Sequence, residues 1–379
     1  MVGRTIQRID APTPNFYLGQ GKVESLKGEM TAAGATLMLF DESLTPVQGV
    51  KLEKSLGMRV MDRTEVILDI FATRARSHEA KLQVELAQLE YLLPRLTRMW
   101  THLSRIRGGI GLRGPGETQL ETDRRVIRRK ISMLKKRLKD VAEHRANQRQ
   151  GRRDVPTAAL VGYTNAGKSS LLKALSGAEV FIEDRLFATL DTLAREVDVG
   201  EGYRFRVTDT VGFIRKLPHH LVASFRATIE EAQEADLILH VIDASEANWE
   251  EHAEVVEREV GSMQNKRVIH VFNKADLLPD RDAFLGLVRE RYPHAVLTST
   301  VREGSVEDLR RALRTSAQAL RPIAEIRVPI SDGKLLATLH RDAEILHQEQ
   351  TNGVVTLRAR IEARLLGRLR QEGVEVVLG

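Results

Sequence analysis

The sequence predicts an α/β protein whose central part is a mostly parallel sheet wrapped by helices. Three observations favour this fold class. Two long stretches with apolar residues at helical spacing flank a glycine-rich connection, which predicts a long antiparallel helical hairpin. Strand-like runs then alternate with helical stretches, as is typical of a parallel sheet. A shorter alternation at the end of the chain predicts a small α+β domain.

Composition excludes several classes of protein. Of the residues, 42% are hydrophobic and 29% are charged, as is usual for soluble globular proteins. The length of 379 residues indicates two or three domains. No stretch approaches the roughly 18 apolar residues of a membrane span, and the first residues lack the apolar core of a secretory signal. Because there is no cysteine, disulfides and thiolate metal sites are excluded. We therefore expect a soluble, cytoplasmic protein.

The net charge of +6 conceals an asymmetry along the chain. Residues 1–155 carry 29 Lys and Arg against 18 Asp and Glu, whereas residues 156–379 carry 29 against 34. The excess is concentrated between Arg95 and Arg153, where 18 basic residues accompany 5 acidic ones. Such a concentrated basic segment indicates a polyanionic partner.

The N-terminal residues are expected to form a small α/β subdomain. Thr36–Asp41 and Arg59–Arg63 are short strand-like runs, and Pro46–Leu56 between them has a helical pattern.

The basic segment is expected to form the helical hairpin. From Ser77 to Arg107 apolar residues step by three and four positions, which predicts a helix that Pro94 kinks. A second helical series follows Thr118, whose hydroxyl and Glu121 have the spacing of a capping box. Residues 108–116 hold five glycines and a proline, so we expect them to form the tip and to continue neither helix.

Five strand-like runs alternate with helices in the second half, at residues 157–162, 204–209, 236–243, 267–272 and 295–298. After a helix that ends near Leu320, the last residues are expected to form a β-α-β-α-β tail. The expected domains are an N-terminal subdomain (1–76), the hairpin (77–150), a linker (151–156), a nucleotide-binding domain (157–320) and the small C-terminal domain (321–379).

A phosphate-binding motif lies directly after the first of these strands. The pattern G-x4-G-K-S is formed by Gly162, Tyr163, Thr164, Asn165, Ala166, Gly167, Lys168 and Ser169. Its glycines let backbone N–H groups surround a β-phosphate at a helix N-terminus, Lys168 can neutralise the β- and γ-phosphates, and the Ser169 hydroxyl can bind Mg²⁺.

Two further motifs end later strands. Asp209, Thr210, Val211 and Gly212 place a carboxylate near the Mg²⁺ and a backbone N–H near a γ-phosphate. Asn273, Lys274, Ala275 and Asp276 offer a carboxylate that accepts from N1–H and the 2-amino group of guanine, both absent from adenine. The ordered series therefore predicts GTP rather than ATP.

Two further segments complete the candidate site. In the segment Phe187, Ala188, Thr189, Leu190 and Asp191, the threonine could close over Mg²⁺ and the γ-phosphate, with Thr192 as the alternative. Ser299, Thr300 and Val301 follow the last strand of the domain and could contact guanine from its other side. A plain turn is the competing interpretation of each segment.

With these motifs in order behind a glycine-rich hairpin, the chain resembles the HflX family of ribosome-associated P-loop GTPases. The resemblance is carried by GQGKVESL, MWTHLSR, GGIGLRGPGETQLETDRR, VGYTNAGKSSLL, LFATLD and DTVGFIRKLPHHLVASF. It implies an N-terminal HflX domain, a Ras-like G domain and a small C-terminal domain. It also implies GTP hydrolysis, with Ser169 and Thr189 as Mg²⁺ ligands and Lys168, Thr189 and Gly212 as catalytic residues.

The resemblance further implies binding to the large (50S) ribosomal subunit, with roles in splitting or rescuing stalled ribosomes under stress or in subunit biogenesis.

The family usually has a further strand and helix ahead of the segment that starts near Pro12, so the N-terminal subdomain is expected to be shortened. TLAR follows LFATLD where a proline is usual, and Thr300 stands where alanine is common.

The residue after Gly212 bears on the hydrolysis rate. Many GTPases have a glutamine there that orients the attacking water, whereas Phe213 cannot hydrogen-bond to water. Slow hydrolysis that the ribosome stimulates is therefore expected. Asn165 resembles a residue that holds K⁺ in some GTPases with the same N-A-G-K-S core, and an ordinary loop asparagine is the alternative.

The hairpin is expected to bind the sugar-phosphate backbone of folded RNA, because no aromatic residue that could stack on bases occurs from Thr101 to Gly162. The candidate contacts are Arg107, Arg113, Arg124, Arg125, Arg128 and Arg129. The resemblance places the tip at the peptidyl-transferase region of rRNA. The alternatives are a solvated coiled-coil arm, an RNA-binding assembly or anti-association factor, and a peripheral membrane adaptor. No DNA partner is expected, and the chain is expected to be a monomer.

Overall fold

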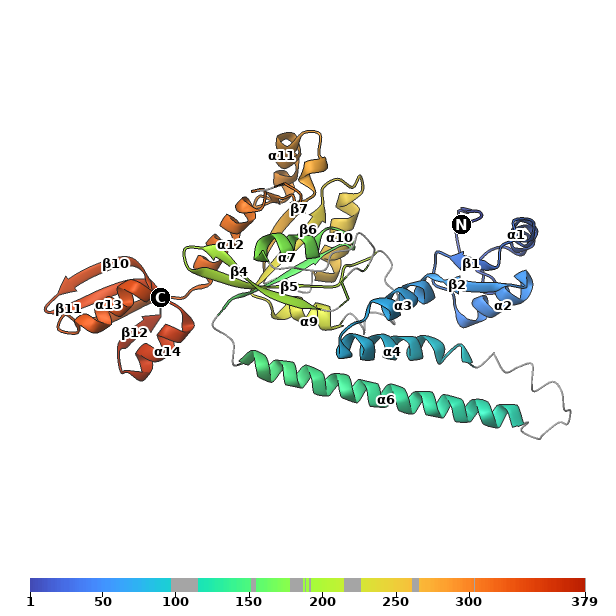
Figure 1. Ribbon diagram of the computed structural model, residues 1–379, viewed down its shortest axis with the longest axis horizontal. Helices are drawn as coiled ribbons and strands as arrows, with labels where there is room; N and C mark the ends of the chain where they lie inside the picture. Colours follow the sequence, from blue (N-terminus) through green and yellow to red (C-terminus); the bar gives the residue numbers. More distant parts are fainter. Residues whose placement is uncertain are drawn as a thin grey trace. The chain divides into compact units, whose positions relative to one another are not determined.

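The computed structural model describes residues 1–96, 115–150, 155–177, 187, 189–190, 192–214, 226–260, 266–302 and 304–378. The described residues fall into two compact units, one built mainly from Met1–Glu143 and the other mainly from the residues that follow. Figure 1 labels their helices and strands. None of the described helices is both long and apolar enough to cross a membrane.

The first unit begins with a two-stranded parallel sheet, β1 (Leu37–Phe40) and β2 (Arg59–Asp62). Three helices accompany it: α1 (Gln20–Ala32), α2 (Pro46–Leu56) and α3 (Arg63–Arg74). The α2 helix has the bounds that the sequence predicts because Thr45 and Gln48 form a capping box at its start and Gly57, at φ 73°, ends it.

Asp62 joins this sheet to the next helix, α4 (His78–Leu92). Its buried carboxylate accepts hydrogen bonds from the Tyr91 hydroxyl at 3.0 Å, from Arg95 at 3.1 Å and from the Leu44 backbone N–H at 3.0 Å. Burial and the Asp62 charge raise the pKa of Tyr91, so its hydroxyl remains a donor. The contacts connect the end of β2 to the C-terminal end of α4.

The hairpin consists of α4 and α6 (Pro115–Gln150), which run in opposite directions (Figure 1). Its seam is apolar, and it is formed by Leu82, Leu86, Leu89 and Leu93 of the first arm with Ile127, Ile131, Leu134 and Leu138 of the second. Ion pairs from Lys130 to Glu85 (2.5 Å) and from Lys135 to Glu90 (2.8 Å) flank the seam. At 36 residues, α6 is about 54 Å long.

The hairpin differs from the expectation at two places. The first helix ends at Leu92 and a turn follows at residues 93–95, where Pro94 cannot supply the N–H that another helical turn requires; residues 97–107 of the predicted helix lie outside the described residues. The second helix starts at Pro115, before Thr118, so the last two residues of the predicted tip are helical. Proline suits the first helical position, where the N–H would be unpaired anyway.

The second unit contains a six-stranded sheet in the order β4-β5-β3-β6-β7-β8. Its strands are β3 (Thr157–Gly162), β4 (Leu193–Gly200), β5 (Tyr203–Asp209), β6 (Leu237–Asp243), β7 (Arg267–Asn273) and β8 (Val296–Leu297). All described pairs are parallel except β4 with β5. The β4 strand is not among the predicted strands; it lies at the sheet edge and alternates between exposed and buried residues.

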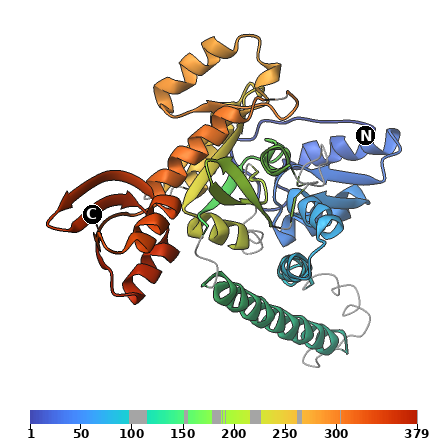
Figure 2. The ribbon, with the colours of Figure 1, turned by 60° about the vertical axis from the view of Figure 1, so that its left-hand side comes forward.

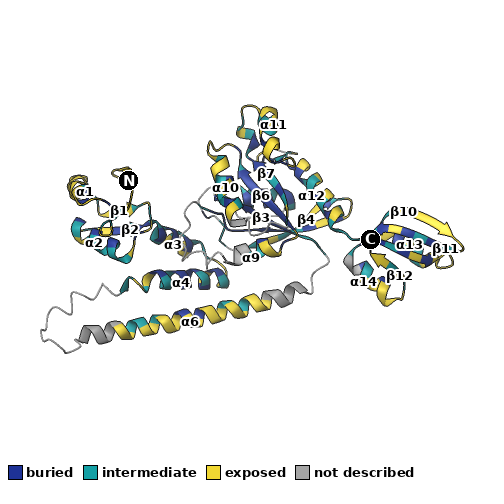
Figure 3. Ribbon diagram, turned by 180° about the vertical axis from the view of Figure 1, so that it is seen from behind, coloured by how far each residue is buried: buried dark blue, intermediate teal, exposed yellow. Residues whose placement is uncertain are grey.

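Helices cover both faces of this sheet, and the strands between them are largely buried (Figure 3). One apolar layer contains residues of α7 (Lys168–Ser176) and α12 (Glu307–Leu320). The other face packs against α9 (Arg226–Glu234), α10 (Trp249–Val260) and α11 (Arg281–Arg291). The carboxyl ends of the parallel strands meet at one edge, where such folds bind their ligands.

The chain ends in a four-stranded antiparallel sheet in the order β10-β11-β9-β12. It comprises β9 (Ile323–Pro329), β10 (Glu344–Thr351), β11 (Val354–Arg360) and β12 (Glu375–Leu378). Two helices, α13 (Gly333–Asp342) and α14 (Ala363–Gln371), pack on one face (Figure 2). The β10 strand is not among the predicted strands because this exposed edge strand is almost entirely polar.

Candidate nucleotide-binding site

The G-x4-G-K-S motif lies between β3 and α7. The strand ends at Gly162, as the sequence predicts, and the helix begins at Lys168, the seventh residue of the motif. Two loop residues adopt left-handed backbone angles, Asn165 at φ 63° and Gly167 at φ 91°. A Cβ atom at Gly167 would lie 2.2 Å from Nδ2 of Asn273, so the second motif glycine is required by both its backbone angle and its close neighbour.

Lys168 is buried inside this loop. Its Nζ donates hydrogen bonds to the carbonyl oxygens of Gly162 at 3.1 Å and Tyr163 at 2.9 Å. Burial lowers the pKa of Lys168 to about 8, and the Asp209 charge opposes the shift. Phosphate oxygens in the loop would favour the ammonium form, so the side chain lies where a phosphate charge can compensate for its lost hydration.

Three oxygen-bearing side chains meet beside Lys168. The Ser169 hydroxyl donates to Oδ2 of Asp209 at 2.6 Å and lies 2.6 Å from the Thr189 hydroxyl. Burial raises the pKa of Asp209, and its Oδ1 is buried with no hydrogen-bond partner among the described residues. Two hydroxyls and an unsatisfied carboxylate oxygen fit the oxygen preference of Mg²⁺.

Gly212 packs against the loop. A Cβ atom there would lie 2.6 Å from Cα of Thr164 and 2.9 Å from Nζ of Lys168, so a side chain would displace the loop backbone. The backbone of Phe213 continues the contact, since it donates to the Gly162 carbonyl at 3.0 Å and accepts from the Thr164 N–H at 2.7 Å. Gly212 thus brings its backbone into close contact with the phosphate-binding motif.

The ring of Phe213 lies in the apolar layer with Ala159, Val161 and Ile238 and is buried. It faces the protein interior, and a phenyl ring has no group to orient water. Phe213, the residue after Gly212, therefore offers no group that could orient water as a glutamine would.

Asn273 connects the predicted guanine-recognition loop to the phosphate loop. Its Nδ2 donates to the carbonyl oxygen of Ala166 at 3.0 Å, and its Oδ1 accepts from the Thr298 hydroxyl at 3.2 Å. Lys274 has a left-handed backbone angle, φ 60°, and its Nζ lies 2.6 Å from Oδ2 of Asp243. Thr298 and Asp243 are not among the predicted site residues, although each lies at or beside the end of a strand in this sheet.

Asp276 and Ser299 form a pair in the same loop cluster. The buried Ser299 hydroxyl donates to Oδ1 of Asp276 at 2.5 Å. The serine therefore orients the carboxylate that is predicted to read guanine. Thr300 is half-buried, and Val301 is 82% exposed.

Of the remaining predicted site residues, some are buried in the fold and others lie outside the described residues. Phe187 is buried, with φ 55°, and its backbone N–H donates to the Thr164 hydroxyl at 3.1 Å. The Thr210 hydroxyl donates to the Leu160 carbonyl at 2.6 Å, so this buried side chain supports the sheet instead of facing a ligand. Val211 is buried, Ala275 begins the 3₁₀ turn Ala275–Leu277, and Leu190 is half-buried. Ala188 and Asp191 lie outside the described residues.

The basic residues of the hairpin are partly described. Arg125, Arg128 and Arg129 on α6 are exposed, and Arg124 is half-buried. By contrast, Lys130 and Lys135 pair with glutamates of α4. Arg107 and Arg113 lie outside the described residues.

Comparisons with known proteins agree along most of the chain. Three family models match: a GTP-binding GTPase N-terminal domain over residues 1–72, a GTP-binding GTPase middle region over 74–152, and a 50S ribosome-binding GTPase over 157–274. The chain is 45% identical over 378 residues to the GTPase HflX of Magnetococcus marinus, covering 97% of this chain and 87% of the relative. It is 43% identical to the GTPase HflX of Escherichia coli, covering 93% and 84%.

A solved structure, a GTP-binding protein from Sulfolobus solfataricus in complex with GDP, matches with a TM-score of 0.46 and 25% identity, covering 82% of this chain and 89% of that chain.

Proposed function

The chain belongs to the HflX family of GTPases, and from this premise we propose that it binds the 50S ribosomal subunit through the basic α6 arm and couples GTP hydrolysis to the splitting or rescue of ribosomes under stress. The enzyme hydrolyses GTP to GDP and phosphate. The observation that carries the proposal is the presence in one chain of an exposed basic helix face and a nucleotide loop flanked by hydroxyl and carboxylate groups.

The nucleotide chemistry is assigned to groups that already converge. Lys168 neutralises the β- and γ-phosphates, and Gly212 offers its N–H to the γ-phosphate. Ser169 and Thr189 would hold Mg²⁺, and Asp209, which accepts a hydrogen bond from Ser169, would support these ligands. When bound, Mg²⁺ supplies positive charge to the phosphate oxygens. Asp276, oriented by Ser299, selects guanine, with Thr300 and Val301 beside it.

The hydrolysis rate is proposed to depend on the ribosome. The buried Phe213 ring leaves no side chain at its position to orient water, so we assign the missing stabilisation to a group that the ribosome supplies or orders. Asn165 is exposed in the phosphate loop and is the candidate to hold K⁺ beside the phosphates.

The hairpin is proposed to be the RNA-binding arm. Arg125, Arg128 and Arg129 are exposed on α6, and the apolar seam with α4 leaves this basic face free to contact phosphates. The tip, with Arg107 and Arg113, is assigned to the peptidyl-transferase region of rRNA. The domain limits proposed above, a monomeric state, and a cytoplasmic location with at most peripheral membrane contact belong to the same proposal.

Sedimentation tests the proposal directly. The full chain is centrifuged through gradients with 70S ribosomes, 50S subunits or anionic vesicles, each in GTP or GDP and at two salt concentrations. Conversion of 70S particles to subunits in GTP supports splitting. Binding restricted to precursor subunits favours the alternative, a biogenesis or anti-association factor in which hydrolysis only times release. Binding to vesicles but not to ribosomes would refute both.

A further inference from the structure

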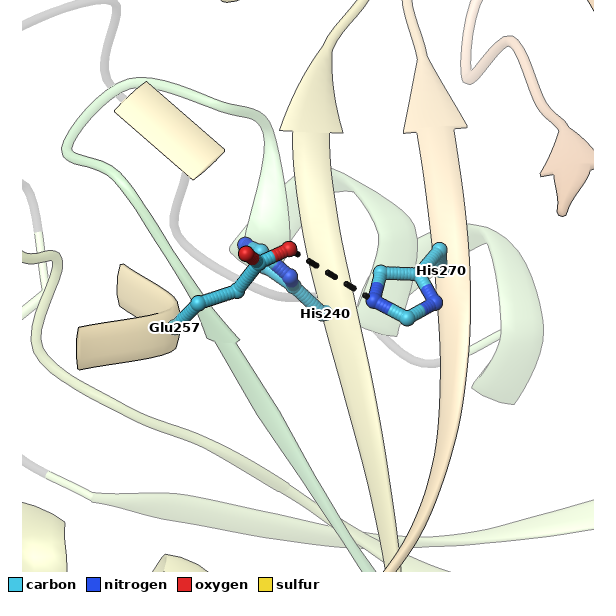
Figure 4. Close-up of side chains that lie close together, drawn as sticks. All are labelled: His240, Glu257 and His270. Carbon is cyan, nitrogen blue, oxygen red and sulfur yellow. Dashed lines mark ion pairs between the residues drawn. The ribbon is translucent and has the colours of Figure 1, made fainter. Parts of the chain in front are cut away.

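A cluster of metal-ligand side chains lies beneath α10, on the sheet face opposite α7. His240 of β6 and His270 of β7 are direct partners in the parallel register, so their side chains emerge on the same face of the sheet. Glu257 of α10 faces them across the packing layer (Figure 4). One ligand atom from each of the three side chains lies within 4.8 Å of the other two.

His240 has a buried group that the fold does not satisfy. The residue is 3% exposed, and its Nε2 has no hydrogen-bond partner among the described residues. A buried polar nitrogen without a partner costs about 1–3 kcal/mol, so native proteins rarely retain one without a reason. Neither the GTPase chemistry nor the apolar packing around Val256 and Ile238 supplies that reason.

The protonation states suit a metal ion. Burial, the neighbouring His270 and Lys168 lower the pKa of His240 to about 3, and burial also lowers the pKa of His270. Both imidazoles are therefore neutral at pH 7 and keep a lone pair for coordination. A metal ion can bind them without displacing protons, which would otherwise weaken binding.

Glu257 is held in place by two neighbours. The Tyr292 hydroxyl donates to its Oε1 at 2.7 Å, and Arg291 lies 3.1 Å from its Oε2. Nε2 of His270 is 3.9 Å from Oε1. Such outer partners orient a ligating carboxylate in many metal sites, and the partial exposure of Glu257 and His270 leaves a route for an ion to enter.

We propose that His240, His270 and Glu257 form a binding site for a divalent transition-metal ion of the Zn²⁺ class. Two imidazoles and one carboxylate are a ligand set that Zn²⁺ accepts, with an open fourth position, whereas Mg²⁺ and Ca²⁺ prefer all-oxygen sites. Ligand atoms around tetrahedral Zn²⁺ are about 3.3 Å apart, so the three groups need to approach by at most about 1.5 Å, which side-chain rotation can provide.

The site would fasten α10 to the centre of the sheet. The strands that carry the histidines end at Asp243 and Asn273, so an ion there stiffens the support of the guanine-recognition loop. It is separate from the Mg²⁺ ligands Ser169 and Thr189 and does not depend on the proposed ribosomal role.

Metal titration of the full chain tests the proposal. Chelator-treated protein, saturated with Mg²⁺ and GDP, is titrated with ZnCl₂ by calorimetry and with CoCl₂ by visible absorption. We expect one equivalent of Zn²⁺ to bind and raise Tm, and Co²⁺ to give the intense visible bands of a four-coordinate site. Replacing the buried His240 could prevent folding, so the two partly exposed ligands are replaced instead, in the variants H270Q and E257Q.

Each variant should lose at least about tenfold in Zn²⁺ affinity. The matched control H294Q, at an exposed histidine of the same unit, should leave affinity unchanged. Circular dichroism and GDP affinity equal to the original chain show that the variants fold. Equal Zn²⁺ affinity in all chains, absence of one-equivalent binding, or the bands of a six-coordinate Co²⁺ ion would each overturn the proposal.

Discussion

Asn273 donates from Nδ2 to the carbonyl oxygen of Ala166, 107 residues away in sequence and 3.0 Å away in space. Through this hydrogen bond the loop that is proposed to recognise guanine and the phosphate loop form one hydrogen-bonded element, and the Thr298 hydroxyl donates a second bond to Asn273. The sites proposed for the base and for the phosphates are therefore directly connected.

Replacing Asn273 by Ala should loosen this element. The change removes both hydrogen bonds and leaves the buried Thr298 hydroxyl without its acceptor, so the free energy of unfolding should fall by about 2 kcal/mol. Affinity for GDP and GTP should fall together. Urea unfolding and fluorescent-nucleotide titration measure the two effects. T298V, which removes only one bond, should cost less; an equal or larger cost would contradict the role assigned to the Ala166 contact.

Asp276→Asn should change base preference. The amide can donate where the carboxylate only accepts, so it no longer matches the N1–H and 2-amino groups of guanine but suits the 2-carbonyl of xanthine. GTP affinity should fall by about 10² or more, and xanthosine triphosphate should bind in its place. Competition binding with both nucleotides measures the switch. S299A, which removes only the orienting hydrogen bond, should weaken GTP without the gain for xanthine.

Lys168 gives a pH dependence to the nucleotide-free protein. Its pKa in the folded protein is about 8, below the usual 10.5, so the unfolded chain binds more protons between these pH values. The contribution of Lys168 to stability is therefore least favourable below pH 8 and improves as the pH rises towards 10.5. Urea unfolding at pH 7.5 and 9.5 should show this gain in the original chain but not in K168M. Parallel pH profiles would argue against a buried, shifted lysine.

GTP turnover should be slow for the free chain and faster with 50S subunits. Because the Phe213 ring is buried in the apolar layer, F213Q should destabilise the fold by about 2–4 kcal/mol without producing a fast enzyme. Phosphate release with and without 50S subunits, in K⁺ and in Na⁺, measures both points. Fast turnover without 50S subunits would refute the proposal that the ribosome supplies or orders the missing group. Equal rates in K⁺ and in Na⁺ would exclude a K⁺ role for Asn165.

The basic face of α6 should set the salt dependence of ribosome binding. R128Q/R129Q removes two exposed charges, so 50S affinity should fall and the slope of log affinity against log salt should decrease by about 2. The control K130Q/K135Q removes two charges that already pair with Glu85 and Glu90, and it should have the smaller effect. Gradient sedimentation from 50 to 200 mM salt measures both; identical slopes would show that this face does not contact RNA.

Much of the architecture follows from local sequence patterns. The phosphate loop, the ends of the parallel strands and the α2 helix lie where their motifs and apolar patterns predict, because neighbouring residues determine a strand–loop–helix turn or a short helix. The missed strands, β4 and β10, lie at sheet edges. Their partners are supplied by tertiary pairing, and their exposed faces carry polar residues that look like loops in sequence.

The sequence by itself determined the order of the nucleotide motifs, the preference for guanine and the position of the basic arm, since each depends on residue types at short spacing. Only the tertiary structure decided which distant groups meet. The Asn273–Ala166 contact, the meeting of Ser169, Thr189 and Asp209, and the pairing of His240 with His270 arise because parallel strands align residues far apart in the chain. That register depends on packing across the whole sheet, which no local motif encodes.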